Sequence, residues 1–315
     1  MAIKLGIIMD PIGSINFKKD STLAMLLEAQ QRGYELFYIE QTDLFLLDQN
    51  VYAQMASFSV ANNPDNWFTL GSQQTRDLSE LDVILMRKDP PFDMNYIFTT
   101  YLLELAESQG TLIVNKPQSL RDANEKLYTA WFPQCTVPTL VSSQSKQLRS
   151  FIDEQQDVIL KPLDSMGGSS IFHVKQGDTN TNVIIETLTL NQTKPIMAQR
   201  FIPEITQGDK RILLIDGKPV PYALARIPSA TDHRANLAAG GTGVGIELSE
   251  RDYWICEQVA PTLKTKGLIF VGIDVIGDYL TEINVTSPTC IRELDQQFGL
   301  NISATLMDCI EQKLQ

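Results

Sequence analysis

The most informative segment of the chain is Val271-Gly-Ile-Asp-Val-Ile-Gly-Asp-Tyr-Leu-Thr-Glu-Ile-Asn-Val-Thr-Ser-Pro288. Two runs rich in Ile, Val and Leu flank Gly277-Asp278, a pattern typical of a β-hairpin. Alternate side chains on a strand point to one face, so Glu282 and Asn284 point together while the apolar residues beside them enter the core. The hairpin therefore presents polar side chains from an otherwise apolar segment.

Asp274, Glu282 and Asn284 offer two carboxylates and an amide oxygen, which suits a hard divalent cation that also holds nucleotide phosphates. The alternative is an edge hairpin with solvated acidic side chains. Shared metal binding needs Asp274 opposite Glu282, which requires a loop of three residues or an equivalent bulge. We therefore predict that Ile276 pairs with Leu280 and that both carboxylates project into a cleft between lobes.

The composition bounds the class of protein. The chain has 315 residues, 43% of them hydrophobic, which suffices for two or three domains. Four scattered cysteines without paired spacing indicate free thiols in a reducing cytosol rather than disulfides or a zinc site. A net charge of −12 argues against a nucleic-acid partner, and no apolar run is long enough for a membrane span. The apolar start, residues 3–9, is typical of a buried strand and not of a signal peptide, so we expect a cytoplasmic protein.

Residues 1–122 alternate strands and helices, which predicts an N-terminal α/β domain with a parallel sheet covered by helices. The span 48–80 shows little periodicity and is expected to be irregular. Within this domain, strands are expected at 3–9, 35–39, 83–86 and 111–114, and a helix at 96–108.

Two lobes of the α+β class are expected after residue 122. Residues 123–200 predict a small central lobe, and 201–315 predict a larger C-terminal lobe that carries the hairpin. A helix is expected to open over Leu120–Leu127. Further strands are expected at 158–162, 171–174, 195–201, 211–215, 220–226, 268–275 and 280–284, with helices at 250–266 and 301–313.

Two lysines and a short strand are candidates for binding an anionic nucleotide. Lys161 precedes Gly167-Gly168, where small residues let backbone N–H groups approach phosphate, although an ordinary turn beside a surface lysine is the alternative. Lys126 lies on the expected helix, where lysines are usually solvated. The strand Met197–Pro203 could offer backbone groups to adenine or could simply be buried. No Walker-type loop occurs, and 241–245 lacks the flanking strand and helix of a dinucleotide fingerprint.

Five long motifs follow one another along the chain. They are Asn115-Lys-Pro-Gln-Ser-Leu-Arg-Asp-Ala-Asn-Glu-Lys126, Lys161-Pro-Leu-Asp-Ser-Met-Gly-Gly168, Gly208-Asp-Lys-Arg211, Ala235-Asn-Leu-Ala-Ala-Gly-Gly241 and Thr281-Glu-Ile-Asn-Val-Thr-Ser-Pro-Thr289. Together they closely resemble the prokaryotic glutathione synthetase family of ATP-grasp ligases, and the resemblance spans nearly the whole chain.

The resemblance implies an ATP-grasp fold with ATP between the two later lobes, and it implies a role for each matching residue. The residues expected to contact ATP are Lys126, Lys161, Gly167, Gly168, Gln199, Arg200, Phe201, Ile202 and Asp209. The expected ligands of two Mg²⁺ ions, which Mn²⁺ can replace, are Asp274, Glu282 and Asn284. The expected catalytic residues, facing the γ-phosphate and the acyl phosphate, are Arg211 and Arg226. Candidates for substrate binding are Asn16, Lys18, Arg87, Arg234, Asn236 and Arg292.

The implied reaction joins γ-glutamylcysteine and glycine, with ATP as co-substrate, to give glutathione, ADP and phosphate. The cysteinyl carboxylate attacks the γ-phosphate, and the amine of glycine then attacks the resulting acyl phosphate. Such chemistry depends on positioning and charge neutralisation, which suits a chain without a nucleophile–base pair. Water would hydrolyse the acyl phosphate, so a lid is expected over 227–242. The family that the sequence resembles has a basic residue at the position of Thr242. In this chain Arg234 is therefore expected to be the main cation of the loop.

Alternatives remain open. One is another ATP-grasp carboxylate–amine ligase, such as a D-alanine–D-alanine or glutamate-adding enzyme. The other is a nucleotide-binding regulatory protein without turnover, against which the intact Asp274, Glu282 and Asn284 set argues. The resemblance also implies a homotetramer, although no stripe in the sequence identifies its interface. Cys290 could be read as a nucleophile, but a structural thiol fits better because neither histidine is close in sequence.

Overall fold

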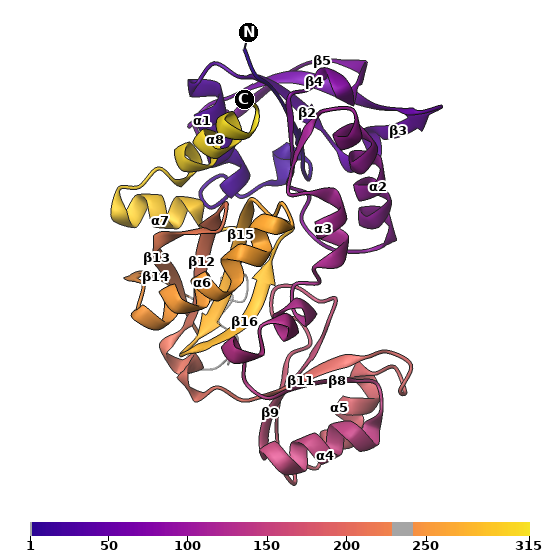
Figure 1. Cartoon of the computed structure of the whole chain (residues 1–315), viewed down its shortest axis with the longest axis vertical. Coiled ribbons are helices and arrows are strands. Elements are labelled where there is room, and N and C mark those ends of the chain that lie inside the picture. The colour runs from indigo at the N-terminus through magenta and orange to yellow at the C-terminus, as the bar shows by residue number, and fades with distance from the viewer. Residues whose placement is uncertain (1, 229–241) are drawn as a thin grey trace.

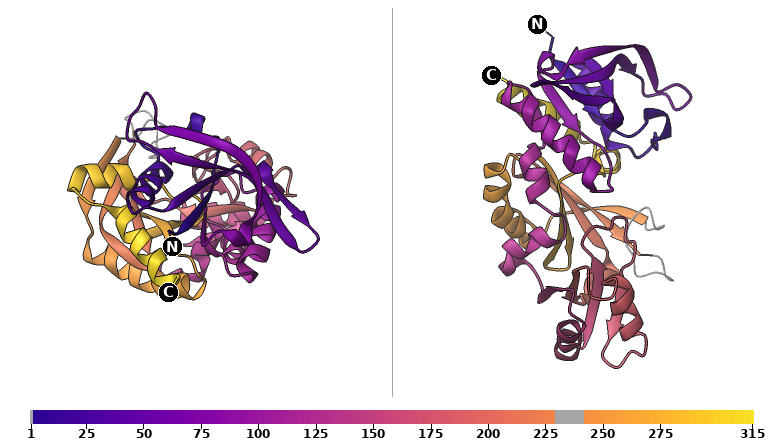
Figure 2. Two further views of the ribbon diagram at one scale, coloured as in Figure 1. Left: turned by 90° about the horizontal axis from the view of Figure 1, so that it is seen from above. Right: turned by 90° about the vertical axis from the view of Figure 1, so that its right-hand side faces the viewer.

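The computed structural model describes residues 2–228 and 242–315, and three sheets organise this part of the chain. The N-terminal sheet lies at one end of an elongated molecule, a five-stranded sheet lies in the middle, and a four-stranded sheet lies at the other end (Figures 1 and 2). The mixed α/β architecture with antiparallel later sheets agrees with the expected fold class.

The N-terminal sheet combines a parallel half with an antiparallel half. Its order is β3-β4-β2-β1-β6-β7, with β5 paired to β4. Strands β2, β1, β6 and β7 run parallel, as the alternation of strands and helices predicts. The elements of this region are β1 Lys4–Ile8, α1 Ser21–Gln31, β2 Glu35–Ile39, β3 Leu44–Leu47, β4 Asn50–Val60, β5 Phe68–Asp77, β6 Val83–Met86, α2 Met94–Ser108, β7 Leu112–Val114 and α3 Pro117–Asp122.

The expectation that residues 48–80 are irregular is wrong, because most of this span forms the long hairpin β4–β5. The side chains of β4 alternate between buried and exposed, but a register shift between Ala56 and Phe58 interrupts the alternation. Strand β5 is exposed along most of its length and is therefore polar in sequence. Both features weaken the period-two signal by which a strand is recognised.

The helix expected over Leu120–Leu127 is also wrong, because α3 ends at Asp122. The side-chain oxygen of Asn124 accepts hydrogen bonds from the backbone N–H groups of Lys126 (3.2 Å) and Leu127 (2.9 Å). Such side-chain contacts compete with helical hydrogen bonds and favour a turn. A 3₁₀-helix then follows at Leu127–Trp131. Lys126 is 4% exposed, so it points into the molecule and not into solvent.

The four-stranded sheet is antiparallel, in the order β10-β9-β11-β8, and has its own core with α4 and α5. The pairing of β9 with β10 confirms the two strands expected on either side of the glycine loop. The elements are β8 Thr139–Ser142, α4 Ser145–Gln155, β9 Asp157–Pro162, β10 Phe172–Lys175, α5 Thr181–Leu188 and β11 Ile196–Arg200.

The five-stranded sheet is antiparallel, in the order β14-β13-β12-β15-β16, and contains the hairpin. The last helix, α8, packs against α1 of the N-terminal region (Figure 1). Arg32 at the end of α1 donates to Asp308 (2.7 Å) and Glu311 (3.1 Å) of α8, which ties the two ends of the chain together. The elements are β12 Asp209–Ile215, β13 Lys218–Ile227, β14 Thr242–Glu247, α6 Glu250–Thr265, β15 Phe270–Ile276, β16 Tyr279–Asn284, α7 Ile291–Phe298 and α8 Ile302–Lys313.

Candidate functional site

The loop of the β15–β16 hairpin has two residues. Ile276 pairs with Tyr279, so the predicted pairing of Ile276 with Leu280 is wrong. Gly277 takes the first loop position with a φ of +55°, a conformation that glycine adopts without strain. A two-residue loop alone would turn Asp274 away from Glu282.

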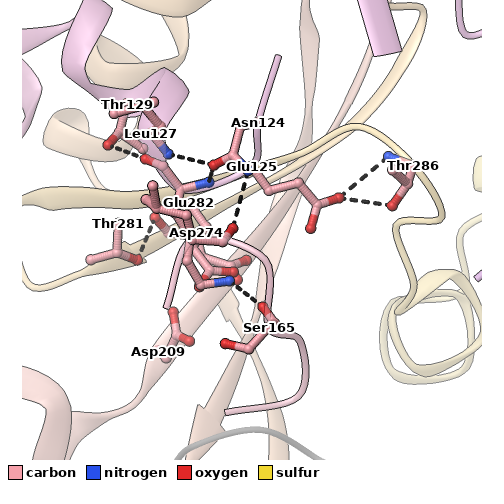
Figure 3. A network of polar contacts seen from close by, with 12 residues as sticks. Asn124, Glu125, Leu127, Thr129, Ser165, Asp209, Asp274, Thr281, Glu282 and Thr286 are labelled. Atoms are coloured by element: carbon pink, nitrogen blue, oxygen red, sulfur yellow. Dashed lines mark hydrogen bonds and ion pairs between the residues drawn. The ribbon is translucent and has the colours of Figure 1, made fainter. Parts of the chain in front are cut away.

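A β-bulge next to the loop restores the alignment of the acidic residues. Val275 pairs with Leu280 and Asp274 pairs with Glu282, so Thr281 is an extra residue on β16. The hydroxyl of Thr281 donates to the backbone carbonyl of Asp274 (3.1 Å). The two carboxylate-bearing residues therefore lie opposite each other, as Figure 3 shows.

Two buried arginines neutralise Asp274. Arg211, opposite Asp274 on β12, donates through Nε and Nη2 to both oxygens of the carboxylate, with 2.9 Å between Nη2 and Oδ2. Nη2 of Arg226 lies 2.8 Å from the same Oδ2. Burial alone would raise the pKa of Asp274, but Arg211 and Arg226 outweigh it and hold that pKa well below its ordinary value. Asp274 is thus a permanent anion that holds two guanidinium groups together.

Asp209 lies on the other side of Arg226, with 2.5 Å between its Oδ2 and Nη2 of the arginine. Burial raises the pKa of Asp209 to about 7, and the attraction of Arg226 opposes this rise. Its Oδ1 is buried and has no hydrogen-bond partner within the described residues. A free acceptor of this kind suits a ligand hydroxyl, such as that of a ribose.

Lys126 connects the hairpin to the glycine loop. Its ammonium group donates to the carbonyl of Ser165 (2.5 Å) and lies 3.5 Å from Oε1 of Glu282. Within the loop, Gly167 and Gly168 have φ values of +63° and +77°, which side chains rarely tolerate. The loop therefore needs glycine at both positions and is attached to the site through the lysine.

Lys161 lies on β9 and is 5% exposed. Burial lowers its pKa, and the nearby Glu282 acts in the opposite direction. Lys161 is therefore a buried amine beside the acidic hairpin and not a surface lysine of an ordinary turn.

The strand expected to contact adenine is β11 with the residues after it. The backbone N–H groups of Arg200 and Phe201 donate to the carbonyls of Pro138 (3.1 Å) and Asp157 (2.9 Å). Those two N–H groups are therefore engaged within the protein. Gln199 is buried at the end of β11, and Ile202 follows the strand.

A cavity of about 250 Å³ brings most of these groups together. Among its lining residues are seven that the sequence singled out: Lys126, Gly167, Gly168, Arg211, Arg226, Glu282 and Asn284. Asp89 and Pro90 of the N-terminal region line it as well, so two parts of the chain distant in sequence share one site. Cys290 is a buried lining residue, and burial raises the pKa of its thiol, which agrees with a structural role.

Sequence reasoning missed Glu125, Thr286 and Ser287, which also line the cavity. All three lie inside quoted motifs, Glu125 directly before Lys126 and the other two within three residues of Asn284. A position within a quoted motif thus indicated a possible functional residue. Charge and spacing alone could not show which side chains of the motif reach the cavity.

The described substrate-binding candidates do not line this cavity. Arg87 is 6% exposed and donates to the hydroxyl of Thr22 (3.1 Å) and the carbonyl of Pro288 (2.8 Å). Its Nη1 is buried without a partner in the described structure. Burial lowers the pKa of Arg87 to about 10.

Arg292 is likewise engaged within the protein. It donates to the carbonyl of Phe17 (2.8 Å) and to the side chain of Asn62 (2.9 Å). Asn16 and Lys18 are exposed, and the side chain of Asn16 accepts from the backbone N–H of Lys18 (3.1 Å). These contacts shape the first loop.

The lid predicted over 227–242, with Arg234 and Asn236, lies almost entirely outside the described residues. Thr242 begins β14 and is exposed. The glycine-rich run 241–245 is a strand from Thr242 onward, in agreement with the rejection of a dinucleotide fingerprint.

The hairpin fits a hard divalent cation by the chemistry of its donors. No cluster of three or more His, Cys, Asp or Glu side chains suited to a metal occurs within the described ranges, so a third donor must be of another type. Asn284 supplies an amide oxygen, and its amide nitrogen is buried without a partner among the described residues. With Asp274 and Glu282 it forms an all-oxygen set, which Mg²⁺ prefers over softer ligands.

Comparison with known proteins identifies the family of the chain. The family model "Prokaryotic glutathione synthetase, N-terminal domain" matches residues 3–121, and the model of the ATP-grasp domain of the same family matches residues 125–299. A glutathione synthetase of Pseudomonas syringae pv. tomato is 61% identical over 315 residues, covering 100% of this chain and 99% of the relative. A glutathione synthetase of Escherichia coli O6:H1 is 59% identical over 313 residues, covering 99% of each chain.

Solved structures with low sequence identity share the fold. A D-cycloserine synthetase superimposes with a TM-score of 0.70 at 14% identity, covering 99% of this chain and 100% of that one. The D-alanyl-alanine synthetase A of Vibrio cholerae has a TM-score of 0.61 at 14% identity, covering 100% and 99%. The family models and the full-length relatives confirm the resemblance seen in the sequence: the chain belongs to the prokaryotic glutathione synthetase family and is an ATP-dependent ligase with the ATP-grasp fold.

Proposed function

We propose that the cavity joins γ-glutamylcysteine to glycine at the expense of ATP, giving glutathione, ADP and phosphate. The observation that carries this proposal is the bulged hairpin, which sets Asp274 opposite Glu282 and beside Arg211 and Arg226. Oxygen donors next to fixed cations are what a reaction through anionic phosphates requires. The relatives at about 60% identity favour these substrates over those of other ATP-grasp ligases.

The nucleotide would lie between the four-stranded and five-stranded sheets. Lys126 and Lys161 would hold its phosphates, and Gly167 and Gly168 would cover them. Asp209, with its free Oδ1, would accept from the ribose. Adenine would lie at the end of β11, in contact with Gln199, Arg200, Phe201 and Ile202. Gln199 pairs with both neighbouring strands and the N–H groups of Arg200 and Phe201 are engaged, so the backbone N–H of Ile202 is better placed to hydrogen-bond the base.

The arginines would serve the steps in which negative charge builds. Arg211 and Arg226 are held by buried ion pairs, so they need little reorganisation when an acyl phosphate forms. The cysteinyl carboxylate attacks the γ-phosphate, and the amine of glycine then attacks the acyl carbon and releases phosphate. The protein orients these groups and excludes water.

Asp274, Glu282 and Asn284 would hold two Mg²⁺ ions, which Mn²⁺ can replace. When bound, such ions neutralise the charge of the phosphates. The dipeptide would enter from the side of Asp89 and Pro90.

Arg87 and Arg292 would then act by positioning, not by touching the dipeptide. Arg87 fixes the carbonyl of Pro288, next to lining residues of the cavity, and Arg292 fixes the first loop that contains Asn16 and Lys18. We retain Arg234 and Asn236 as substrate contacts on the resemblance alone.

An assay of ADP release tests the function. The purified protein should release ADP with γ-glutamylcysteine and glycine, and glutathione should accumulate in equal amount. D-Alanine pairs and glutamate, supplied as alternative substrates, should give no more than the rate without amine. ADP release that depends on D-alanine or glutamate instead would reassign the ligase.

We further propose a cytoplasmic homotetramer built from domains at 1–122, 123–200 and 201–315. Within the described ranges, no helix combines the length and apolar character needed to cross a membrane. An exposed apolar surface supports self-association. It comprises Met94, Phe98, Tyr101 and Leu105 on α2 with Phe45, Leu46 and Leu47 on β3. Helix α2 and strand β3 contact each other at one end of the molecule (Figure 1), so these side chains form one surface, α2/β3.

A further inference from the structure

Glu125 is a carboxylate in the cavity for which the proposed reaction has no role so far. Its backbone carbonyl accepts from the N–H of Ile283 (2.8 Å), between two of the expected metal ligands. Its Oε1 accepts from the hydroxyl of Thr286 (2.8 Å) and from the backbone N–H of Thr286 (3.4 Å). Figure 3 shows the side chain directed toward Thr286 and away from Asp274. The carboxylate is therefore fixed beside the reaction centre by neutral groups.

The charge of Glu125 distinguishes it from the acidic residues on and beside the hairpin, whereas Asp89, which lines the cavity from the N-terminal region, shares its lack of an ion pair among the described residues. Asp274 pairs with two arginines, Asp209 pairs with Arg226, and Glu282 pairs with Lys126. Within residues 2–228 and 242–315, Glu125 forms no ion pair. Burial raises its pKa, while the hydrogen bond from Thr286 opposes the rise. A carboxylate of this kind gains most from a cation that the ligand brings.

We infer that Glu125 binds the ammonium group of the amino substrate, glycine, and positions its nitrogen beside the acyl phosphate. The ammonium group releases one proton to solvent, and the neutral amine then attacks the acyl carbon, whose bond to the phosphate oxygen breaks. This inference rests on the proposed function. Two ammonium groups enter the reaction, that of glycine and that of the γ-glutamyl residue. Only the nitrogen of glycine must reach the acyl carbon. Lys126 and Glu282, the proposed phosphate and metal contacts, lie 3.5 Å apart, and Glu125 directly precedes Lys126 and accepts from the residue after Glu282.

The space around Glu125 agrees with a small amine. The residue lines the main cavity and also a second cavity of about 30 Å³, together with Asn124 and Leu163. The small volume of the second cavity suits an amino substrate that carries no side chain.

Glu125→Gln tests the inference, because the amide oxygen can still accept from Thr286 while the charge is lost. The KM for glycine should rise by roughly tenfold or more, the usual effect of losing a charge-assisted hydrogen bond. The KM values for ATP and γ-glutamylcysteine should change less than twofold. Glu104→Gln, far from the cavity in a pair with Arg121, is the matched control and should leave all three values unchanged.

Hydroxylamine provides a second measurement that a misfolded site would fail. It is largely uncharged at neutral pH, and its nitrogen attacks the acyl phosphate to form a hydroxamate, releasing phosphate and a proton. Glu125→Gln should therefore form hydroxamate at close to the wild-type rate while it responds poorly to glycine. Equal losses with both nucleophiles would show a structural role and overturn the inference.

Two further variants separate the remaining explanations. Thr286→Val removes the hydroxyl but keeps the charge of Glu125. A tenfold rise in the KM for glycine in this variant too would show that the hydrogen bond to Thr286, and not the charge of Glu125, controls glycine binding, and would overturn the inference. Glu125→Asp keeps the charge and should bind glycine better than Glu125→Gln does.

If Glu125→Gln raises only the KM for γ-glutamylcysteine, Glu125 binds the ammonium group of the γ-glutamyl residue instead, and the inference is wrong. If the wild-type protein forms no glutathione, the proposed function fails; if it does and Glu125→Gln matches it, only this inference fails.

Discussion

Asp274 is held ionised by Arg211 and Arg226, and its charge in turn keeps both buried guanidinium groups at the cavity. Breaking a buried ion pair from one side leaves an uncompensated charge, which costs about 3–5 kcal/mol. The same carboxylate is an expected metal ligand. At the scale of single residues, stability and function therefore cannot be separated at Asp274, whereas Glu282 and Asp209 allow separate tests.

Glu282→Gln should fold normally but lose most of its ligase turnover, because the hairpin loses a negative charge at the expected metal site. ADP release at saturating Mg²⁺, with thermal unfolding followed in parallel, measures both effects. Glu80→Gln, which alters a surface ion pair with Arg76, is the matched control. Near-wild-type turnover in Glu282→Gln would exclude Glu282 as a principal ligand.

Asp209 predicts a pH dependence of stability. Its pKa is raised in the folded protein from 3.8 to about 7, so between these values the folded state binds more protons than the unfolded state. The free energy of unfolding contributed by Asp209 therefore falls as the pH rises from about 4 to about 7. In Asp209→Asn this decline should be shallower, as urea unfolding across that range would measure. The exposed Asp65→Asn serves as control, and an unchanged slope in Asp209→Asn would contradict the assignment.

At the scale of elements, the hairpin β15–β16 depends on two local features, a tight loop and a bulge. The loop turns the chain in two residues, and the bulge at Thr281 corrects the register that such a loop imposes. Shifting the register by one residue would move Glu282 and Asn284 to the opposite face. The geometry of the site is therefore built into one supersecondary unit.

Gly277→Ala should destabilise the protein by about 1–3 kcal/mol, because a side chain must then adopt a positive φ. The added Cβ would also lie 3.0 Å from Cβ of Glu204. Gly13→Ala is the matched control, since its Cβ would meet only Phe68 at 3.9 Å. Urea unfolding of both variants measures the difference. Equal stabilities of the two variants would show that the loop tolerates the strain.

At the scale of the whole molecule, the cavity lies where the N-terminal region meets the later lobes, and α8 folds back onto α1. The site thus combines residues of the N-terminal region with residues of the later lobes. The exposed α2/β3 surface lies on the N-terminal region, away from the four-stranded sheet (Figure 1). Self-association through this surface would leave the small lobe uncovered.

Replacing Phe98 and Leu46 with glutamate should convert the proposed tetramer into smaller species, because charges on the α2/β3 surface oppose the burial of its apolar side chains. Light scattering coupled to size-exclusion chromatography measures the mass. Val183→Glu, at an exposed apolar residue of α5, is the control and should not change the mass. A tetramer that survives the double substitution would place the interface elsewhere.

The strands of the hairpin, the alternating order of the N-terminal region and the identity of the polar groups can all be predicted from the amino-acid sequence. These follow from short-range rules, namely the period of apolar residues and the chemistry of carboxylate, amide and lysine side chains. The resemblance to a family also rests on residues in order and needs no coordinates.

The folded chain was needed to reveal the bulge at Thr281, the pairing of β4 with β5, and the hydrogen bonds of Arg87 and Arg292 to backbone carbonyls. It also placed Glu125 in the cavity. The contacts of Arg87 and Arg292 join residues far apart in sequence. The bulge and the β4–β5 pairing depend on the register of cross-strand hydrogen bonds, which the period of apolar residues does not specify. Cross-strand hydrogen bonds and burial, acting between distant segments, select one register and one set of contacts from those that the local pattern permits.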